Sequence, residues 1–290
     1  MTEPQPNTDR VVALSVPLRP AATVMLLRDG PAGLEVFMLQ RTMSASFARG
    51  SYVFPGGRVD DADHGEAFEP ICDDVDDAAA SVRLGVEHGG LAWLVAAIRE
   101  CFEEAGVLLA RPSAGTDIVR FDTPDVVDRF NAARHAVHDG TLSLAELCRS
   151  EQLQLLTDQM HFVDHWVTPI GERRRFDTRF FMAKAPEAQE PLHDDVETIA
   201  SLWVRPDRAL EMWRAKQLVM LPPTVVSLDR LARFATADAA LADAAAQSMP
   251  EQRLPRLVLG PDEGFLDIIL PNDERYDSTP LPEFVIPNPR

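Results

Sequence analysis

The sequence has few of the residues that mark secreted or membrane-spanning proteins. Only three of its 290 residues are cysteine, and Cys72, Cys101 and Cys148 lie far apart, which argues against a disulfide framework and favours a reducing, cytoplasmic compartment. No hydrophobic run approaches the roughly 18 residues that a membrane-spanning helix needs. The first ten residues are polar, and we therefore expect no signal peptide there.

Positive charge is also scarce. The chain has 28 Lys and Arg against 46 Asp and Glu, which gives a formal net charge of −18 at pH 7. Nucleic acid and anionic membranes repel such a chain, so we expect neither as a partner. An anionic small molecule would bind only where arginines or metal ions offset the surrounding charge. The apolar share of 46% nevertheless suits a folded globular protein.

Segments of alternating polarity and segments of helical periodicity succeed one another along the chain. We expect strands at 21–28, 34–41, 51–54, 160–168, 175–184 and 199–204, the first two forming a hairpin. We expect helices at 78–84, 91–105, 123–138, 142–156, 206–218 and 223–246. A second hairpin is expected from 256–259 and 264–270. This interleaving predicts an α/β protein with a mixed sheet covered on both faces.

Three parts of the chain differ in composition. We expect an extended or disordered arm at 1–19, a central domain at 20–235, and a C-terminal part at 236–290. The last part would hold a helix end, the second hairpin and an extended proline-rich tail. Within the central domain, 112–158 are expected to form a helical insertion. Residues 58–90, rich in Asp, Glu and Ala, are expected to form an acidic insertion outside the core, open to proteases.

The predicted helix at 91–105 carries a group of acids on one side. At about 100° per residue, Glu103 and Glu104 fall near −60° and +40° from Glu100, opposite the apolar residues. Like charges so close together repel one another, and Mg²⁺ or Mn²⁺ would neutralise them by taking hard oxygen ligands. An ordinary solvated acidic helix face is the alternative interpretation.

Neighbouring residues favour a functional site over a solvated face. Arg99 precedes the acids and can hold a carboxylate through a bidentate contact. The turn Phe54-Pro55-Gly56-Gly57 lies upstream, and glycines let the backbone approach a metal or a phosphate closely. Gly106 follows the acids directly, as expected at the end of a helix.

This pattern resembles the Nudix box, in which a glycine and a glutamate precede Arg-Glu, an apolar residue, any residue, Glu-Glu, any residue, Gly and an apolar residue. Residues 99–107 (RECFEEAGV) match the second half in full, and Gly57 matches the opening glycine. The gap between Gly57 and Arg99 exceeds the standard one by about 28 residues, so the acidic insertion lies within the box. The family's first glutamate, eight residues before the arginine, falls on Leu91. Glu87 or an acid of the insertion would have to replace it.

An interrupted box is similar to that of the coenzyme A and acyl-coenzyme A diphosphatase-like Nudix proteins. The likeness spans about residues 20 to 232 and includes Leu39-Gln40-Arg41, Tyr52–Gly57, Arg175–Phe181, Glu197 with Trp203, and Leu221–Thr224. It implies a Nudix α/β/α sandwich with a mixed sheet and helical insertions. It also implies metal-dependent hydrolysis of coenzyme A or acyl-coenzyme A to adenosine 3′,5′-bisphosphate and a phosphopantetheine product.

The resemblance implies a role for each matching residue. Glu100, Glu103 and Glu104 would bind Mg²⁺ or Mn²⁺ with the Gly56 carbonyl, and Arg99 would orient the first of them. Glu197, in a predicted acidic loop, is the candidate for an additional ligand or base. The candidates for binding the nucleotide diphosphate substrate are Gly57, Arg41, Arg175 and Arg179, because arginine pairs well with phosphate. A solvated basic turn is the alternative interpretation at Arg175 and Arg179, and an ordinary acidic loop is the alternative at Glu197.

Other functions stay open at this point. The alternative substrate is ADP-ribose or a dinucleotide, which the same carboxylates would serve. A non-catalytic Nudix-like module that senses a nucleotide would suit the missing acid at Leu91, although such a module need not keep three repelling carboxylates. A homodimer is one alternative for the oligomeric state. His161 and His165 are expected on a strand, where their spacing does not indicate a zinc site.

Overall fold

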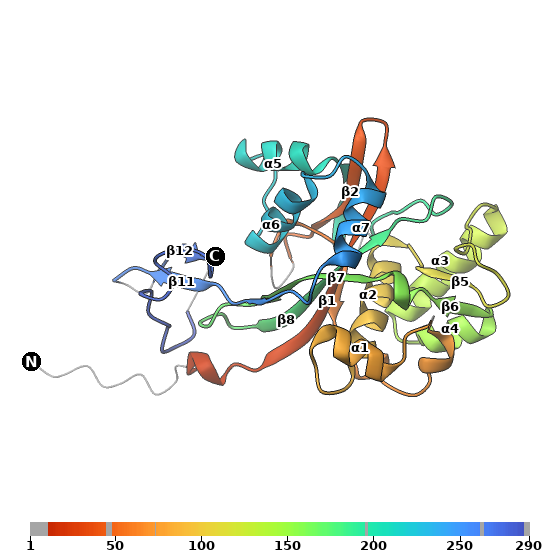
Figure 1. The fold of residues 1–290 in the computed structure, drawn as a ribbon, viewed down its shortest axis with the longest axis horizontal. Helices are drawn as coiled ribbons and strands as arrows, with labels where there is room; N and C mark the ends of the chain where they lie inside the picture. The colour runs from red at the N-terminus through yellow and green to blue at the C-terminus, as the bar shows by residue number, and fades with distance from the viewer. Residues whose placement is uncertain (1–10, 45–47, 73, 195–196, 262–263, 287–290) are drawn as a thin grey trace, which may run out of the picture. The chain divides into compact units, whose positions relative to one another are not determined.

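The computed structural model describes residues 11–44, 48–72, 74–194, 197–261 and 264–286 (Figure 1). The chain divides into two compact units. The larger comprises Ala21–Val163 and Arg179–Pro250, and the smaller comprises Met1–Pro20, Asp164–Thr178 and Glu251–Arg290. No helix within the described ranges is both long and apolar enough to cross a membrane.

Two long strands form the centre of the sheet. Strands β1 (Leu18–Gly30) and β2 (Gly33–Arg41) pair antiparallel and end at the Gly30–Gly33 pair, so the predicted hairpin is confirmed. Strand β1 also pairs with β4 (Gly56–Arg58), and β2 also pairs with β3 (Tyr52–Val53) and β9 (Thr198–Val204). These pairings bring the Gly56-Gly57 turn beside the middle of β1.

The sheet is mixed, as predicted. Its order is β10-β7-β8-β1-β2-β3, with β4 on β1 and β9 on β2. Strands β7 (His161–Val167) and β8 (Arg175–Lys184) occupy the segments expected for them. The short strand β10 (Gln252–Arg253) runs parallel to β7, whereas the pairs of β1 and β2 with β4, β3 and β9 are antiparallel.

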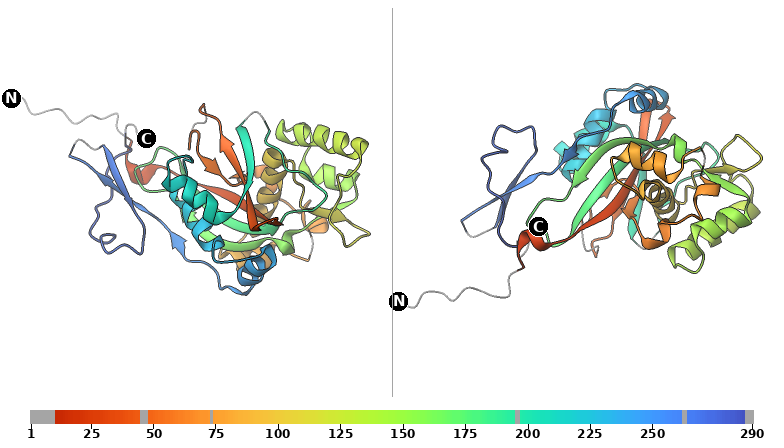
Figure 2. Two further views of the ribbon diagram at one scale, coloured as in Figure 1. Left: turned by 90° about the horizontal axis from the view of Figure 1, so that it is seen from above. Right: turned by 60° about the horizontal axis from the view of Figure 1, so that its bottom comes forward.

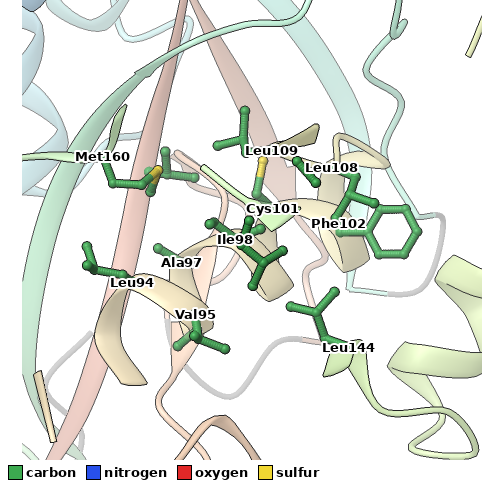
Figure 3. Packing of buried hydrophobic residues seen from close by; sticks show 14 of the residues in the cluster. Leu94, Val95, Ala97, Ile98, Cys101, Phe102, Leu108, Leu109, Leu144 and Met160 are labelled. Carbon is green, nitrogen blue, oxygen red and sulfur yellow. The ribbon is translucent and has the colours of Figure 1, made fainter. Parts of the chain in front are cut away.

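Helix α2 (Gly90–Ala105) is central to the core of the larger unit. Leu94, Ile98 and Phe102 are buried on the face predicted from their spacing (Figure 3). Helix α1 (Asp77–Leu84) packs so closely on α2 that a Cβ atom at Gly90 would lie 2.4 Å from the backbone nitrogen of Ser81. At the other end, Gly106 has a φ of 69°, the left-handed conformation that favours glycine after a helix.

Helices cover both faces of the sheet in the larger unit. Helices α1 and α2 lie on one side with α3 (Pro124–His138) and α4 (Leu144–Ser150) (Figures 1 and 2). Helices α5 (Pro206–Arg214) and α6 (Pro222–Leu231) lie on the other side, and α7 (Ala237–Ala246) follows them in the chain. The fold is therefore the expected α/β type with helical layers on both sides.

Three predicted helices are too long. The helix expected at 142–156 ends at Ser150, because Gln152 has a φ of 53° and Leu153–Leu155 form β6, which pairs with β5 (Ala110–Pro112). The helix expected at 206–218 ends at Arg214, shortly before Lys216 with its φ of 59°. The helix expected at 223–246 is two helices, because Thr236 caps α7 by accepting a hydrogen bond from the Ala239 amide.

The acidic insertion is an excursion from the sheet, as predicted, but the prediction that it lies outside the core is wrong. Its described residues form no sheet strand beyond β4, but they form α1 and two short 3₁₀ helices, η2 (Asp61–Asp63) and η3 (Glu69–Ile71). Its apolar side chains join the main hydrophobic cluster, among them Phe68, Ile71, Cys72, Ala80 and Leu84. Because these side chains gain free energy by leaving water, the segment packs on the domain despite its acidic composition.

The smaller unit contains the second hairpin. Strands β11 (Arg256–Leu259) and β12 (Phe265–Ile269) pair antiparallel, as predicted. The segment after Pro271 is not extended as expected: the Tyr276 amide donates to the Asp273 carbonyl, which closes a turn. Of the predicted N-terminal arm, residues 1–10 lie outside the described ranges, while Ala13–Ser15 form the 3₁₀ helix η1. A last 3₁₀ helix, η4 (Thr157–Gln159), belongs to the larger unit.

Candidate active site

The last turns of α2 carry the acids, and they are not solvated. Glu103 and Glu104 are only 9% and 4% exposed, and Glu100 is largely shielded as well. The simple interpretation as a water-facing acidic helix face is therefore wrong. Burying a carboxylate costs free energy unless a positive charge or hydrogen-bond donors compensate it, so the groups around the three acids decide what the site can do.

The Gly56-Gly57 turn faces two of these carboxylates. The Gly56 amide donates a hydrogen bond of 2.9 Å to Oε2 of Glu104. A Cβ atom at Gly57 would lie 2.4–2.7 Å from the carboxylate atoms of Glu100, and one at Gly56 would lie 2.4 Å from the Ala22 carbonyl oxygen. A side chain at Gly56 would clash with the backbone of β1, and one at Gly57 would displace the Glu100 carboxylate, so glycine suits both positions.

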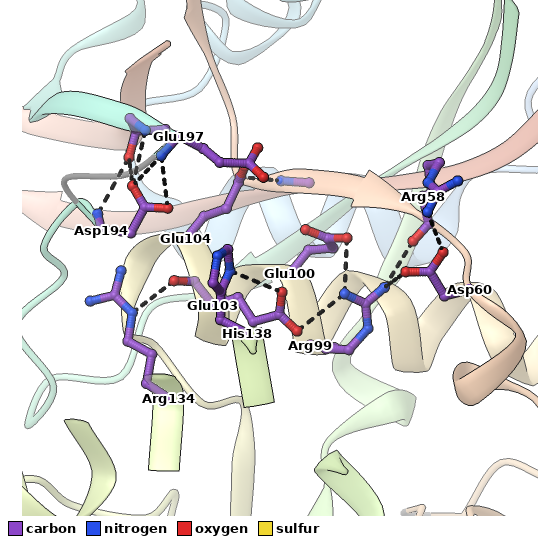
Figure 4. Close-up of polar contacts among 12 residues, drawn as sticks. Arg58, Asp60, Arg99, Glu100, Glu103, Glu104, Arg134, His138, Asp194 and Glu197 are labelled. Atoms are coloured by element: carbon purple, nitrogen blue, oxygen red, sulfur yellow. Dashed lines mark hydrogen bonds and ion pairs between the residues drawn. The ribbon is translucent and has the colours of Figure 1, made fainter. Parts of the chain in front are cut away.

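Arg99 joins the acids into one network (Figure 4). Its Nη1 donates to Oε1 of Glu100 at 3.0 Å and to Oε1 of Glu103 at 3.2 Å. Its Nε and Nη2 donate to the two carboxylate oxygens of Asp63 at 2.7 and 2.9 Å. Although burial opposes the charge, these carboxylates hold the pKa of Arg99 above its ordinary value.

Asp63 is a site residue that counting back from Arg99 misses. Arg99 follows Gly57 by 42 residues, whereas in the standard box the arginine follows the glycine by about 28 residues fewer, or about 14. Because the first glutamate of the box lies eight residues before the arginine, it lies about six residues after the glycine. Counting forward from Gly57 lands on Asp63. The insertion therefore follows this acid, and Leu91, which is buried beside α1, has no part in the network.

The carboxylates lack enough positive charge around them. Burial raises the pKa of Glu100 to about 7, and it raises the pKa of Glu103 and of Glu104 as well. Their hard oxygens are the donors that Mg²⁺ and Mn²⁺ prefer. Among the described residues, no three acidic, His or Cys side chains already enclose one point. The donor set thus fits a divalent ion in its chemistry.

Arg41 and Glu197 lie at the edge of the cluster. Nη1 of Arg41 is 3.7 Å from Oε1 of Glu104, and its Nη2 is 3.6 Å from Oε2 of Glu197. The Glu197 side chain is half exposed. Asp194 holds this loop, because its Oδ1 accepts hydrogen bonds from the amides of Glu197 and Thr198 at 3.1 and 2.9 Å. The predicted loop acid is thereby brought to the carboxylates.

Helix α3 supplies two contacts that no sequence motif predicts. Nε of Arg134 donates to the Glu103 carbonyl oxygen at 2.7 Å, and Nδ1 of His138 lies 3.7 Å from Oε2 of Glu103 (Figure 4). Both residues come from the helical insertion. No local signal in the sequence relates them to Glu103, because the contact depends on how α3 packs against α2.

Arg175 and Arg179 have other surroundings. Nε of Arg175 donates to the Thr168 carbonyl oxygen within the smaller unit. The guanidinium of Arg179 lies over the ring of Trp93, 4.5 Å from its centroid. Both arginines are buried, so neither is part of a solvated basic turn. His165 pairs with Asp177 at 2.5 Å, and His161 lies on the same strand.

A family model described as the NUDT19 Nudix domain matches residues 77–231, which include all of α2. The chain belongs to this Nudix family. Human acyl-coenzyme A diphosphatase NUDT19 is 29% identical over 295 residues, which cover 89% of this chain and 76% of the human protein. The protein of that name from Gallus gallus is 26% identical, covering 87% and 75% of the two chains.

A solved structure agrees with the Nudix fold. The NUDIX hydrolase from Alicyclobacillus acidocaldarius superposes with a TM-score of 0.63 at 28% identity, covering 79% of this chain and 97% of that protein. The protein is thus a Nudix hydrolase of the diphosphatase type, as the sequence motif predicted. Nudix hydrolases generally use divalent metal ions, which is consistent with the carboxylate donors on α2.

Proposed function

We propose that this Nudix protein hydrolyses the diphosphate bond of coenzyme A or an acyl-coenzyme A, with Mg²⁺ or Mn²⁺ bound by Glu100, Glu103 and Glu104. The observation that carries the proposal is the gathering of three buried carboxylates beside the Gly56-Gly57 turn. The substrate class is supported by the NUDT19 relatives, which are named acyl-coenzyme A diphosphatases. The products would be adenosine 3′,5′-bisphosphate and a phosphopantetheine or its acyl derivative.

Each residue has a task in this proposal. A bound divalent ion would neutralise the diphosphate and activate the attacking water. Arg99 holds Glu100 and Glu103 ready as ligands, and the Gly56 amide holds Glu104. The Gly56 carbonyl is proposed as a further ligand, and Gly57 is a proposed substrate contact because its missing side chain leaves the Glu100 carboxylate in place. Glu197, half exposed at the edge, is the proposed base that accepts a proton from the water.

Arg41 is the proposed contact for a substrate phosphate. Its guanidinium lies between Glu104 and Glu197, and its Nε is buried with no hydrogen-bond partner within the described parts of the chain. A phosphate oxygen would supply that partner, since arginine matches phosphate geometry well. A role for Arg175 or Arg179 in holding the 3′-phosphate of coenzyme A would require either one to leave its contact with Thr168 or Trp93.

The test compares kcat/KM for coenzyme A, dephospho-coenzyme A and ADP-ribose, first with Mg²⁺ and then with Mn²⁺. If a charged group contacts the 3′-phosphate, coenzyme A should exceed dephospho-coenzyme A by about ten- to a hundred-fold, the worth of one charged hydrogen bond. Mass spectrometry of the products identifies the bond that is cleaved. A preference for ADP-ribose would replace the substrate assignment with the dinucleotide alternative. Binding without turnover of any of the three would favour the nucleotide-sensing module.

Two further proposals concern the cellular location and the oligomeric state. The cysteines Cys72, Cys101 and Cys148 are all free and buried, which supports the proposed reducing, cytoplasmic location. A homodimer stays a proposal that size-exclusion chromatography with light scattering would test.

A further inference from the structure

Helix α3 contacts one of the proposed metal ligands at two points. Arg134 and His138 are four residues apart, so they project from the same face of α3 toward the end of α2. Arg134 donates to the main-chain carbonyl of Glu103, and His138 faces the carboxylate of the same residue (Figure 4). Helix α3 therefore contacts both the backbone and the side chain of Glu103.

The Arg134 contact fixes where Glu103 lies. The carbonyl of Glu103 is among the last four of α2, which have no partner within the helix. Arg134 is buried and bridges this carbonyl to that of Leu192, with hydrogen bonds of 2.7 and 3.1 Å. Helix α3 is thereby anchored to the end of α2, and this keeps the last turn of α3 beside the Glu103 side chain.

The His138 contact restricts how the Glu103 carboxylate turns. Oε1 accepts a hydrogen bond from Arg99, and Oε2 lies 3.7 Å from Nδ1 of His138, so different groups face its two oxygens. A glutamate held through one oxygen alone can rotate about its terminal bond. A protonated His138 attracts Oε2 across 3.7 Å, so a positive group near each oxygen restricts this rotation.

We propose that His138 is a positioning residue, which holds the Glu103 carboxylate in the orientation that binds the divalent ion. The helical insertion thereby sets the metal affinity of the site. This rests on the proposed function, in which Glu103 is a metal ligand. Residues that orient metal ligands typically change metal affinity or activity by about 10- to 100-fold when they are replaced. The His138 side chain is 31% exposed, so its replacement leaves no cavity in the core.

The test uses the full chain and three variants. His138→Ala removes the contact, and His138→Asn keeps a nitrogen near the place of Nδ1. His135→Ala changes an exposed histidine in the same last turn and serves as the matched control. Binding of Mn²⁺ alone is measured from the paramagnetic resonance signal of the free ion. The dissociation constant should rise about tenfold in His138→Ala. It should stay close to that of the unaltered protein in the other two variants.

Activity measured against metal concentration separates positioning from a direct role in the reaction. In His138→Ala the half-activating metal concentration should rise by the same factor as the dissociation constant, while kcat recovers at saturating metal. A kcat deficit that persists at saturating metal would overturn the proposal, because His138 would then act on the substrate. An unchanged dissociation constant in His138→Ala would overturn it as well.

Glu103→Gln distinguishes this proposal from the one on which it rests. If Glu103→Gln weakens Mn²⁺ binding and His138→Ala does not, only the positioning role is wrong. If Glu103→Gln leaves Mn²⁺ binding unchanged, the metal-ligand assignment fails and the role of His138 fails with it. Circular dichroism establishes that each variant is folded.

Discussion

Both carboxylate oxygens of Asp63 accept hydrogen bonds from the guanidinium of Arg99, at 2.7 Å from Nε and 2.9 Å from Nη2. Asp63 belongs to the acidic insertion and Arg99 to α2. This bidentate pair leaves Nη1 of Arg99 directed at Glu100 and Glu103. The insertion therefore interrupts the motif only after supplying the acid that holds its arginine.

Replacing Asp63 should impair catalysis without unfolding the protein. Asp63→Asn removes the charge that fixes Arg99, so Arg99 holds Glu100 and Glu103 less well, and kcat should fall about 10- to 100-fold. Asp61→Asn, at an exposed position in the same 3₁₀ helix, is the matched control. Glu87→Gln tests the other candidate for the missing acid and should have no effect. Equal losses in Asp63→Asn and Glu87→Gln would contradict the assignment of Asp63.

The carboxylates themselves should be far more sensitive. Glu103→Gln and Glu104→Gln each remove one negative charge from the proposed metal site, and kcat should drop by orders of magnitude while the circular dichroism spectrum is retained. The change adds no bulk, so packing around α2 should be preserved. Near-normal rates in both variants would contradict the assignment of the metal site.

Arg41 should act on substrate affinity. Arg41→Ala removes the guanidinium that faces Glu104 and Glu197, and KM should rise more than kcat falls, because the lost contact is to a substrate phosphate. A charged hydrogen bond of this kind is worth about 1.5–3 kcal/mol, or about ten- to a hundred-fold. Arg58→Ala, whose exposed side chain pairs with Asp60, is the control. An effect confined to kcat would show that Arg41 orients the acids and does not bind substrate.

The stabilisation of the protein by a metal ion should depend on pH. Burial raises the pKa of Glu100 from 4.5 to about 7, so the folded state binds this proton more tightly than the unfolded chain does. In the metal-free protein, the associated stability is fully present below pH 4.5 and is lost as the pH rises to about 7. A divalent ion favours the ionised carboxylate and offsets this loss.

Thermal unfolding with and without Mg²⁺ checks this linkage. The increase in Tm on adding the ion should be larger at pH about 8 than at pH about 5, where protons compete with the metal. In Glu100→Gln, the metal-free protein should lose less stability over the same pH range. An equal increase in Tm at both pH values would contradict the role of these carboxylates.

The central hairpin, α2 and the second hairpin were predicted because each depends on local signals: alternation, helical periodicity and turn residues. The boundaries at Ser150 and Thr236 were missed because they depend on neighbours. Leu153 and Leu155 are buried in a strand that pairs with β5, and the loop before α7 accepts a hydrogen bond from Leu34 at the Ala235 carbonyl. Burial of Phe68 and Leu84 likewise overrides the acidic composition of the insertion.

Helical periodicity is enough to place Glu100, Glu103 and Glu104 on one side of a helix, because positions three and four apart always share one side. The run Pro55-Gly56-Gly57 likewise predicts a turn. Tertiary packing is needed to bury these acids, to bring Asp63 into contact with Arg99, and to bring His138 to Glu103. Those relationships join residues 35 or 36 positions apart in the chain. They exist because α3 and the insertion pack their apolar side chains against α2, and this packing brings their polar groups to its last turns.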